Sequence, residues 1–368
     1  MPRNSSVDIL HICKVYLPIR GGVQKVVQSI SSLTNAFNHH VLTTGEDGAV
    51  ASQTIDGATI TRCRSYLDIA SMPIAPSIIG QTIKQAKKCQ LICVHYPFPL
   101  ADLALMMTVE APPIIVYWHS NIVVQKKLKW LTYPLVYLTL RRAKVIVVTS
   151  ERMIENSTLL TRFREKVKII PYGLSSVDRV QASDEILEDY FVLVGRHVSY
   201  KGIEIAIQAL GNIDTRLVIV GDGPLYEQHK LLAKTFGLGD KVTFKKNASD
   251  NEVMGLIQNS IALIIPSVMH NEAFGLVQLE AMRLRKPVIN TSLPSTVPMI
   301  ARHQKEGLTI EPNNSDALAQ AMLQMASDRP WVATLGNNGY QRFNEKFTDI
   351  KFKQALDALF EELLASQK

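Results

Sequence analysis

Short apolar runs alternate with segments of helical periodicity along nearly the whole chain. In the first half, the strand-like runs are residues 7–16, 39–44, 91–95, 114–118 and 144–149. Parallel strands need a long crossover between them, and this crossover is usually a helix. The alternation therefore predicts an α/β fold with parallel, doubly wound sheets. A second series of the same kind opens at residues 190–194, so we expect the arrangement twice.

The length and charge of the chain indicate how many domains it has and what kind of partner it binds. A chain of 368 residues exceeds one typical domain, and the polar, acidic segment 175–189 is the expected linker between two domains. The net charge of +7 and the pI of about 9.1 favour an anionic partner. The candidates are a nucleotide, a nucleic acid and an acidic membrane surface.

The four cysteines indicate neither disulfides nor a zinc site. Cys13, Cys63, Cys89 and Cys93 form no C-x-x-C pair, and no His/Cys cluster accompanies them. Reduced thiols fit a cytoplasmic protein best. No apolar run reaches the roughly 18 residues that a spanning helix needs, and the start of the chain lacks the apolar core of a signal peptide. We therefore expect a cytoplasmic protein.

The stretch over residues 261–284 contains the strongest functional pattern. Residues 261–266 are a short apolar run typical of a buried strand. The positions that follow with helical spacing are Leu276, Val277, Leu279, Met282 and Leu284. Residues 271–275 are then a strand-to-helix loop, in which Gly275 lets the backbone approach a ligand closely. The amides of residues 274–277 would form a helix N-terminus, which binds phosphate or hydroxyl oxygens.

Two carboxylates bracket this expected helix start, Glu272 before it and Glu280 within the helix. At 1.5 Å per residue, about 9 Å would separate Phe274 from Glu280 along the helix axis. A diphosphate that joins two sugars needs such a span, with the anion on the amides and the sugar hydroxyls on the carboxylates. The alternative is a surface helix with two unrelated glutamates.

The loop after the first strand-like run contains Pro18, Gly21 and Gly22. A strand, a glycine loop and a helix form a geometry that brings a phosphate or a sugar close to the backbone. This loop lacks a full GxGxxG pattern. A tight turn that needs positive φ is an equal alternative.

Two basic residues flank glycines after the run at residues 190–194. They occur as Gly195-Arg196 and Lys201-Gly202, just before a predicted helix. Fixed cations stabilise the negative charge of a diphosphate. The alternative is a pair of solvated basic residues, but cations at a helix start oppose the helix dipole. A purely structural role is therefore less attractive for them.

Two histidines lie at the ends of strand-like runs, His95 in Val-His-Tyr-Pro and His119 in Tyr-Trp-His-Ser. Ligands of open α/β sheets bind outside the carboxyl ends of the strands, so both residues are candidates for a substrate contact. The alternative is a structural histidine whose ring nitrogens are satisfied within the protein. The residues alone leave both alternatives open.

No acidic residue occurs between Glu110 and Glu151. The basic and aromatic positions that we single out in this window are Lys126, Lys127, Lys129, Trp130, Arg141 and Arg142. A helix here would lie against an anionic membrane, with the tryptophan at the level of the headgroups. The alternatives are a solvated basic face and a surface that grips an anionic acceptor directly.

Several motifs together resemble those of the retaining glycosyltransferases of the GT-B fold, family 4. Glu272 and Glu280 match the E-x7-E element of that family, with Phe-Gly after the first glutamate. Further matches are Pro-x-x-Gly-Gly at 18–22, Ile-Pro-x-Gly at 170–173 and Gly-Arg-x4-Lys-Gly at 195–202. The resemblance covers nearly the whole chain and is strongest over residues 194–298.

The resemblance implies two Rossmann-like domains that face a cleft. Residues 1–177 would bind the acceptor, residues 178–348 would bind the donor, and the last helix, within 349–368, would pack back on the first domain. The implied reaction moves a hexose, with retention, from a nucleotide diphosphate sugar to a carbohydrate or lipid-linked acceptor. Similarity to bacterial surface-polysaccharide mannosyltransferases favours GDP-mannose as the donor, O-antigen or polysaccharide synthesis as the setting, and no nucleic-acid partner.

The family's residue roles transfer position by position. The catalytic residues would be His119 and Glu272 on the donor sugar and Arg196 and Lys201 on the diphosphate, while Glu280 would bind the ribose. The further donor-binding positions are Gly21, Gly22, Phe244, Lys245, Ala273, Phe274, Gly275, Leu276 and Val277. No Asp-x-Asp pair is present, so we expect neither a metal nor another cofactor. No carboxylate is clearly placed as a nucleophile, which favours a front-face mechanism.

One loop departs from the family pattern. Residues 291–298 lack the glycine-rich version common there, which puts in doubt any donor assignment taken from glycine-rich members.

A nicotinamide dehydrogenase would share the layout but should show GxGxxG with an acid about twenty residues further on. A nucleotide-sugar epimerase, or a non-catalytic nucleotide-sugar-binding protein of the same fold, stays an open alternative.

Overall fold

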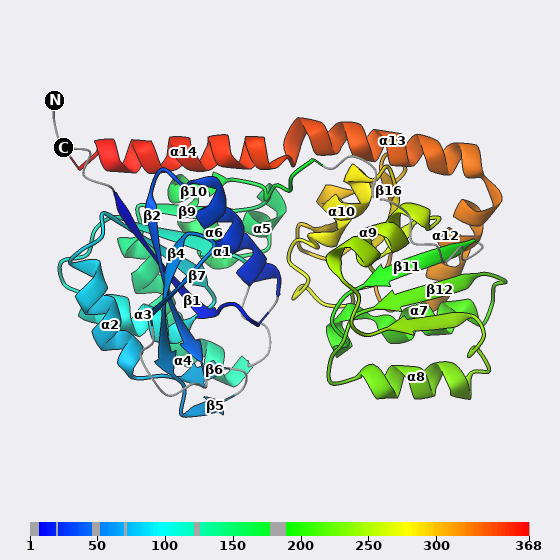
Figure 1. The fold of residues 1–368 in the computed structure, drawn as a ribbon, viewed down its shortest axis with the longest axis horizontal. Coiled ribbons are helices and arrows are strands. Elements are labelled where there is room, and N and C mark those ends of the chain that lie inside the picture. Colours follow the sequence, from blue (N-terminus) through cyan, green and yellow to red (C-terminus); the bar gives the residue numbers. More distant parts are fainter. Residues whose placement is uncertain are drawn as a thin grey trace. The chain divides into compact units, whose positions relative to one another are not determined.

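The computed structural model describes residues 7–19, 21–45, 52–69, 72–120, 126–176 and 189–367. They form two compact units, each with its own sheet and helices (Figure 1). The first unit consists of Met1–Pro171 with Ile350–Lys368, and the second of Tyr172–Asp349. The predicted boundary between residues 177 and 178 lies outside the described residues. The predicted fold class, two Rossmann-like α/β domains, is confirmed.

An eight-stranded sheet forms the centre of the first unit. Its order is β10-β9-β8-β7-β1-β2-β4-β3, and of these strands only β3 is antiparallel to its neighbour. The strands are β1 (Asp8–Val15), β2 (Asn38–Gly45), β3 (Ser52–Ile55), β4 (Ala58–Arg64), β7 (Leu91–Tyr96), β8 (Ile114–Trp118), β9 (Val145–Val148) and β10 (Val167–Ile169). A separate hairpin contains β5 (Leu67–Ile69) and β6 (Met72–Ile74). The direction of winding changes between β1 and β7.

Helices cover both faces of this sheet. They are α1 (Gly22–Leu33), α2 (Ser77–Ala86), α3 (Pro99–Met107), α4 (Lys126–Arg142), α5 (Glu151–Glu155), α6 (Thr158–Arg162) and α14 (Asp349–Ala365), with a 3-10 turn at Arg164–Lys166. Ile12 and Val94 project to one face and share a large buried cluster with residues of α2 to α6. Cys13 and Val41 project to the opposite face, where Val27 of α1 covers them. The strands are therefore buried on both sides, which is why most of their residues are apolar.

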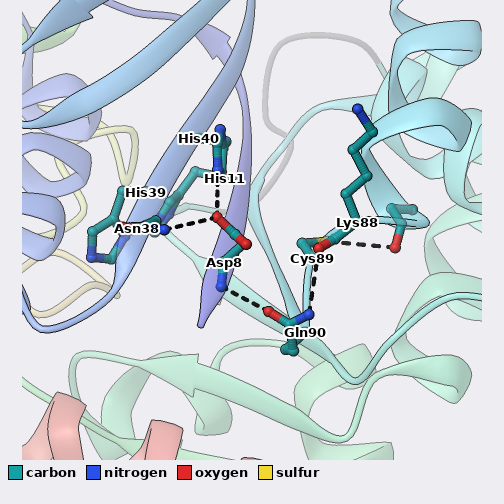
Figure 2. Close-up of polar contacts among 9 residues, drawn as sticks. Asp8, His11, Asn38, His39, His40, Lys88, Cys89 and Gln90 are labelled. Carbon is teal, nitrogen blue, oxygen red and sulfur yellow. Dashed lines mark hydrogen bonds and ion pairs between the residues drawn. The ribbon is translucent and has the colours of Figure 1, made fainter. Parts of the chain in front are cut away.

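Asp8 links the amino ends of three neighbouring strands (Figure 2). Its amide donates to Gln90 Oε1 at 2.7 Å, just before β7, and its carboxylate accepts from Asn38 Nδ2 at 3.1 Å in β2. His40 Nε2 lies 2.9 Å from the same carboxylate oxygen. These contacts hold β1 between β2 and β7, in agreement with the pairing of Asp8 with Asn38.

The last helix of the chain packs on the first unit (Figure 1). The residues that α14 buries are Phe352, Leu356, Leu359, Phe360 and Leu363. The Phe360 ring meets the Phe37 ring edge to face, with 5.6 Å between the centroids. Lys168 of β10 forms an ion pair with Glu362. The first unit is thus completed by a segment that follows the second unit in the sequence.

A six-stranded, parallel sheet of order β13-β12-β11-β14-β15-β16 forms the centre of the second unit. Its strands are β11 (Tyr190–Val194), β12 (Arg216–Val220), β13 (Val242–Lys245), β14 (Leu263–Ile264), β15 (Val288–Thr291) and β16 (Gly307–Ile310). The direction of winding changes between β11 and β14. In open α/β sheets, ligands bind outside the carboxyl ends of the strands at such a switch point.

The helices of the second unit flank this sheet. They are α7 (Ile203–Leu210), α8 (Tyr226–Thr235), α9 (Asp250–Asn259), α10 (Val277–Arg283), α11 (Val297–Ile300), α12 (Ser315–Ser327) and α13 (Arg329–Lys346), with the 3-10 turn η2 (Ser199–Lys201). In neither unit does a described helix combine the length and apolarity needed to cross a bilayer.

The start of α10 differs from the prediction. The helix begins at Val277, whereas the sequence analysis placed its N-terminus at Phe274. Gly275 has a φ of 73°, in the left-handed region that a right-handed helix does not contain. Phe274 and Glu280 therefore do not share one helix. The predicted separation of about 9 Å along a common helix axis is wrong.

Candidate active site

Lys201 and Glu272 form an ion pair at the switch point of the second unit. Lys201 ends the turn η2 that follows β11, and Glu272 lies in the loop that follows β14. The Lys201 Nζ and Glu272 Oε2 atoms are 2.5 Å apart, and the two side chains are 16% and 10% exposed. Both are predicted donor-binding residues, but their pairing with each other was not predicted.

Two hydroxyl groups support the Glu272 carboxylate and its loop. Ser267 Oγ donates to Glu272 Oε2 at 3.2 Å, and Thr291 Oγ1, at the end of β15, donates to the Ser267 carbonyl at 2.6 Å. All three residues are buried. The site thus joins the ends of β11, β14 and β15. Neither hydroxyl was predicted, although both residues follow apolar runs, which is a signal that the sequence contains.

The Lys201 ammonium is charged at neutral pH despite its burial. Burial is the largest single influence and lowers the pKa of Lys201, but the Glu272 carboxylate, which also accepts a hydrogen bond from it, and Tyr200 together raise that pKa above its ordinary value. The pair therefore places a preorganised cation, partly balanced by one carboxylate, beside the strand ends. Such a group stabilises negative charge that develops during a reaction.

Gly202 allows the loops after β11 and β14 to touch. Its φ is 65°, and a Cβ atom added there would lie 2.0 Å from the Pro266 carbonyl oxygen. The Val268 amide donates to the Tyr200 carbonyl at 2.9 Å and ties the same two loops together. Only glycine fits at this position, and the close approach of the loops brings the two members of the ion pair together.

Arg196, the second predicted cation, has a different environment. It follows β11 directly after Gly195, and its side chain is exposed. The two cations therefore belong to one loop region after β11, but Lys201 is only 16% exposed and forms the ion pair, whereas Arg196 is exposed. An exposed arginine contributes little to folding stability, so a role for Arg196 has to come from a ligand.

Phe244 and Lys245, which were predicted to lie near the nucleobase, end β13. The Lys245 carbonyl accepts a hydrogen bond at 2.9 Å from the Gly221 amide, in the turn after β12. The Phe244 ring is partly buried, 6.1 Å from the His197 ring and 5.9 Å from the Tyr226 ring. Burial, and then the neighbouring His229, lower the pKa of His197 to about 4, so that ring is neutral. His197 and Tyr226 are buried, so Phe244 is the one ring of the three that a flat, uncharged ligand surface could reach.

The loop before α10 contains the remaining predicted donor-binding residues Ala273, Phe274, Gly275, Leu276 and Val277. The Phe274 side chain is buried and lies 4.8 Å from the Tyr172 ring, so it anchors the loop. Gln278 Nε2 donates to the Phe274 and Val297 carbonyls, each at 3.2 Å. Glu280 is partly buried in the first turn of α10 and is not a member of the Lys201 ion pair.

Gly21 and Gly22 lie in the first unit, where α1 begins after β1. Gly21 has a φ of −175°, an extended conformation open to any residue, and neither glycine has positive φ. The alternative of a turn that demands positive φ is therefore wrong. A Cβ atom added at Gly21 would lie 2.5 Å from Gln24 Oε1, so the glycine leaves room for that side chain. Gln24 in turn donates to the Val15 carbonyl at 3.2 Å.

His95 lies in β7 and His119 directly follows the neighbouring strand β8, and the two rings contact each other. His119 Nε2 is 2.9 Å from His95 Nδ1, and both residues are buried. Burial lowers the pKa of His119 to about 3, so its ring is neutral at physiological pH. The contact satisfies one ring nitrogen, as the structural alternative required. The predicted contact of His119 with a sugar stays a prediction.

The basic segment forms α4, which continues through Pro134. The side chains of residues 126–131, and so those of the predicted Lys126, Lys127, Lys129 and Trp130, lie outside what the structure describes. Arg141 is exposed. The Arg142 guanidinium donates to the carbonyls at the end of α3, with 2.7 Å to Thr108. Arg142 thus caps a neighbouring helix, and the membrane role of the segment stays a prediction.

Known proteins resemble the chain in both units. Residues 20–176 match the family described as Glycosyltransferase Family 4, and residues 181–342 match the family described as Glycosyl transferases group 1. The D-rhamnosyltransferase WbpZ of Pseudomonas aeruginosa is 31% identical over 352 residues, with 92% of each chain covered. The O-antigen chain mannosyltransferase C of Escherichia coli is 28% identical over 369 residues, 98% of this chain and 99% of the other.

A solved structure has the same fold. Anabaena Alr3699/HepE in complex with UDP-glucose superimposes with a TM-score of 0.76 at 17% identity, covering 96% of this chain and 99% of the other. At this identity the likeness concerns the fold alone. The family matches span both units, and the Pseudomonas relative covers most of both chains. The protein belongs to the GT-B glycosyltransferases of group 1, family 4.

Proposed function

We propose that this glycosyltransferase moves a hexose, with retention, from a nucleotide diphosphate sugar to a carbohydrate or lipid-linked acceptor in the synthesis of a bacterial surface polysaccharide. The observation that carries the proposal is the Lys201–Glu272 pair at the switch point of the second unit. The names of the two relatives, a D-rhamnosyltransferase and an O-antigen chain mannosyltransferase, support the polysaccharide assignment. The UDP-glucose bound to the Anabaena protein supports the class of donor.

The ion pair suits the departure of a nucleoside diphosphate. Negative charge develops on the diphosphate as its bond to the sugar C1 atom breaks, and fixed cations stabilise that charge. Lys201 and the exposed Arg196 would perform this task, so the proposal requires no metal ion. Glu272 would hold Lys201 Nζ in place and accept a hydrogen bond from a hydroxyl of the donor sugar.

We propose a front-face displacement as the origin of retention. The acceptor hydroxyl attacks C1 from the side on which the diphosphate leaves, and its proton passes to an oxygen of the leaving phosphate. The new bond to C1 forms as the bond to the diphosphate breaks, which keeps the anomeric configuration. This scheme requires no carboxylate of the protein as a nucleophile.

We propose mannose, supplied as GDP-mannose, as the transferred sugar. The Escherichia coli relative is named a mannosyltransferase, and the sugar named for the Pseudomonas relative, D-rhamnose, is 6-deoxy-D-mannose. The two names therefore share one ring stereochemistry. Thermal denaturation with a panel of nucleotide sugars ranks the donors, because a ligand at 100 times its Kd stabilises the folded state by about 2.7 kcal/mol.

Product analysis with GDP-mannose and a mannose-terminated acceptor is the decisive experiment. We expect free GDP and an elongated acceptor with the donor's anomeric configuration, and only when both substrates are present. A new nucleotide sugar would favour an epimerase instead, and binding without turnover would favour a non-catalytic protein. Activity should survive EDTA, whereas a loss that magnesium or manganese restores would contradict the metal-free proposal.

We propose further that α4 brings the first unit to an anionic membrane, where a lipid-linked acceptor would lie. Each cation near the surface adds about 1 kcal/mol of binding to anionic lipid. In flotation, the protein should rise with anionic but not with neutral vesicles, and high salt should reverse this. Exchange of Lys126, Lys127 and Lys129 for Glu should abolish it. If the protein does not float with anionic vesicles at low salt, α4 does not bind an anionic membrane. The assignment as a glycosyltransferase is unaffected by that result.

A further inference from the structure

Four buried histidines form a hydrogen-bonded row across the sheet of the first unit. His119 Nε2 is 2.9 Å from His95 Nδ1, and His95 Nε2 is 3.1 Å from His11 Nδ1. His11 Nε2 is 2.9 Å from His39 Nδ1. The four residues are between 0% and 6% exposed. We call them the histidine row.

The row follows from the register of the parallel strands. His95 pairs with Tyr117, which lies two residues before His119. His11 pairs with Cys93, which lies two residues before His95. His39 pairs with Ile9, which lies two residues before His11. Residues two apart share one face of a strand, so all four side chains project to the same face, where diagonal neighbours come within reach.

The rings meet edge to edge and are neutral. The centroids of His95 and His119 are 5.2 Å apart and their planes differ by 13°, so nitrogen faces nitrogen nearly in one plane. Burial is the largest cause that lowers the pKa of each member, and neighbouring histidines lower those of His11 and His95 further. A neutral imidazole has one N–H donor and one bare nitrogen, so one partner in every contact has to donate.

Thr34, at the end of α1, sets the direction of all these hydrogen bonds. His39 Nε2 lies 3.0 Å from the Thr34 carbonyl oxygen and 3.0 Å from Thr34 Oγ1. The carbonyl can only accept, and the hydroxyl gives its own hydrogen to the Ile30 carbonyl at 2.7 Å. His39 Nε2 therefore has to hold a hydrogen, which leaves His39 Nδ1 bare to accept from His11 Nε2.

Each hydrogen bond fixes the direction of the next, so each member donates through Nε2 and accepts through Nδ1. We propose that the row fixes His119 in the Nε2–H tautomer and makes its Nδ1 a hydrogen-bond acceptor, with His39, His11 and His95 as positioning residues. Any group that meets this nitrogen has to donate a hydrogen. A sugar hydroxyl donates and an ionised phosphate oxygen does not, so this nitrogen selects a hydroxyl over a phosphate. That the hydroxyl belongs to the donor sugar rests on the proposed function.

Nitrogen-15 NMR of the ligand-free protein, labelled at the histidine rings, tests the tautomers directly. Long-range proton–nitrogen correlations distinguish Nε2–H from Nδ1–H rings, and single histidine substitutions assign the signals. We expect all four members of the row in the neutral Nε2–H form at neutral pH. One member in the Nδ1–H form, or one imidazolium in the row, overturns the proposal whatever the enzyme does with sugars.

Substitutions at His39, three hydrogen bonds away from His119, test whether the row transmits the tautomer. His39→Leu removes the acceptor for His11, so the row can reverse and His119 should become a mixture of tautomers. His39→Gln retains a donor and an acceptor and should restore the wild-type signal. His40→Gln is the matched control, because His40 bonds to Asp8 rather than to the row (Figure 2). An unchanged His119 signal in folded His39→Leu overturns the proposal.

Transfer kinetics test the functional half. In His39→Leu, kcat/KM for the donor should fall about tenfold, the size of one lost neutral hydrogen bond. His39→Gln should recover most of this loss, and His40→Gln should match the wild type. In a His119→Ala background, His39→Leu should cost nothing further, because its effect passes through that ring.

Two results contradict different parts of this scheme. Equal losses from His39→Leu with and without His119 would indicate general structural damage and overturn the positioning role. No transfer by the wild-type protein with any donor would contradict the proposed function instead, and the tautomers seen by NMR would be unaffected.

Discussion

Lys201 and Arg196 follow the same strand but are held differently, one buried beside Glu272 and one exposed. Replacing either with alanine should lower kcat/KM by roughly 10²–10³, the effect of deleting one preorganised electrostatic group. Lys201→Ala should also reduce stability, approaching the roughly 3–5 kcal/mol of a broken buried ion pair. Arg196→Ala should leave the melting temperature near that of the wild type. Steady-state kinetics together with thermal denaturation separate the two effects, and equal losses of stability would contradict this difference in burial.

Gly202 and Gly237 allow the effect of a steric overlap to be separated from that of backbone strain. Both have positive φ, 65° and 67°, but an added Cβ would overlap the Pro266 carbonyl at the first position and meets nothing within 4 Å at the second. Gly237→Ala should cost about 1–2 kcal/mol from the left-handed backbone alone. Gly202→Ala should cost clearly more and weaken donor binding as well, because the loops that hold the ion pair have to separate. Urea denaturation measures the loss of folding stability, and donor titration measures the loss of binding. Equal losses of stability in the two variants would mean that the overlap with the Pro266 carbonyl has no effect of its own.

The candidate site was only partly predictable from the residues. Lys201 and Glu272 were identified through motifs, but their pairing depends on the adjacency of β11 and β14, which no local pattern shows. Ser267 followed an apolar run and could have been found from that position. The histidine row was missed because His11 and His39 lie inside runs that were read only as buried strands. The sequence signal for the row is that each histidine lies two residues beyond the partner of the histidine on the neighbouring strand. This can be recognised only once the strand order is known.

At the level of elements, α3 and α4 enclose a carboxyl group without a partner. Asp102 of α3 is fully buried, and within the described ranges neither carboxylate oxygen has a hydrogen-bond partner. Burial raises the pKa of Asp102 to about 7, although the nearby Thr139 side chain partly offsets this. The folded state therefore keeps a proton on Asp102 that the unfolded chain loses near pH 3.8.

This proton makes stability fall as the pH rises from about 4 to about 7, because the folded state binds more protons than the unfolded state in that window. A shift of this size corresponds to on the order of 4 kcal/mol at its upper end. Asp102→Asn should therefore gain melting temperature relative to the wild type as the pH is raised. Asp240→Asn, at an exposed position, is the control for the change in net charge. A difference between Asp102→Asn and the wild type that does not vary with pH would mean that Asp102 is ionised in the folded protein.

The strands and helices themselves were largely predictable, for a physical reason. Strands covered on both faces are mostly apolar, so the runs that became β7, β8 and β11 were plain in the sequence. The short strands β3, β5 and β6 were not predicted, because residues 46–80 show no clear apolar pattern. The start of α10 was misplaced because Gly275 adopts a left-handed conformation, which only the folded backbone reveals.

For the molecule as a whole, α14 makes the stability of the first unit depend on the last residues of the chain. Phe360→Ala should cost about 3–5 kcal/mol, because the ring is fully buried against Phe37. Ile350→Ala, at an exposed apolar position, should cost little. Hydrogen exchange should show lost protection in β1 and β2 of the Phe360 variant but not in β11 and β12. Equal losses in both units would contradict the assignment of α14 to the first unit.

The return of α14 also reverses the order of folding relative to the order of synthesis. A ribosome releases the chain from its amino end at about 5–20 residues per second, and domains fold as units while they emerge. The second unit has all its residues in one continuous segment, Tyr172–Asp349, and can close as soon as that segment is released. The first unit is made earlier but has to wait for Phe360 to cover Phe37. During that interval the nascent chain exposes the apolar side chains that α14 later covers, Phe37 among them, and a chaperone would bind such a surface.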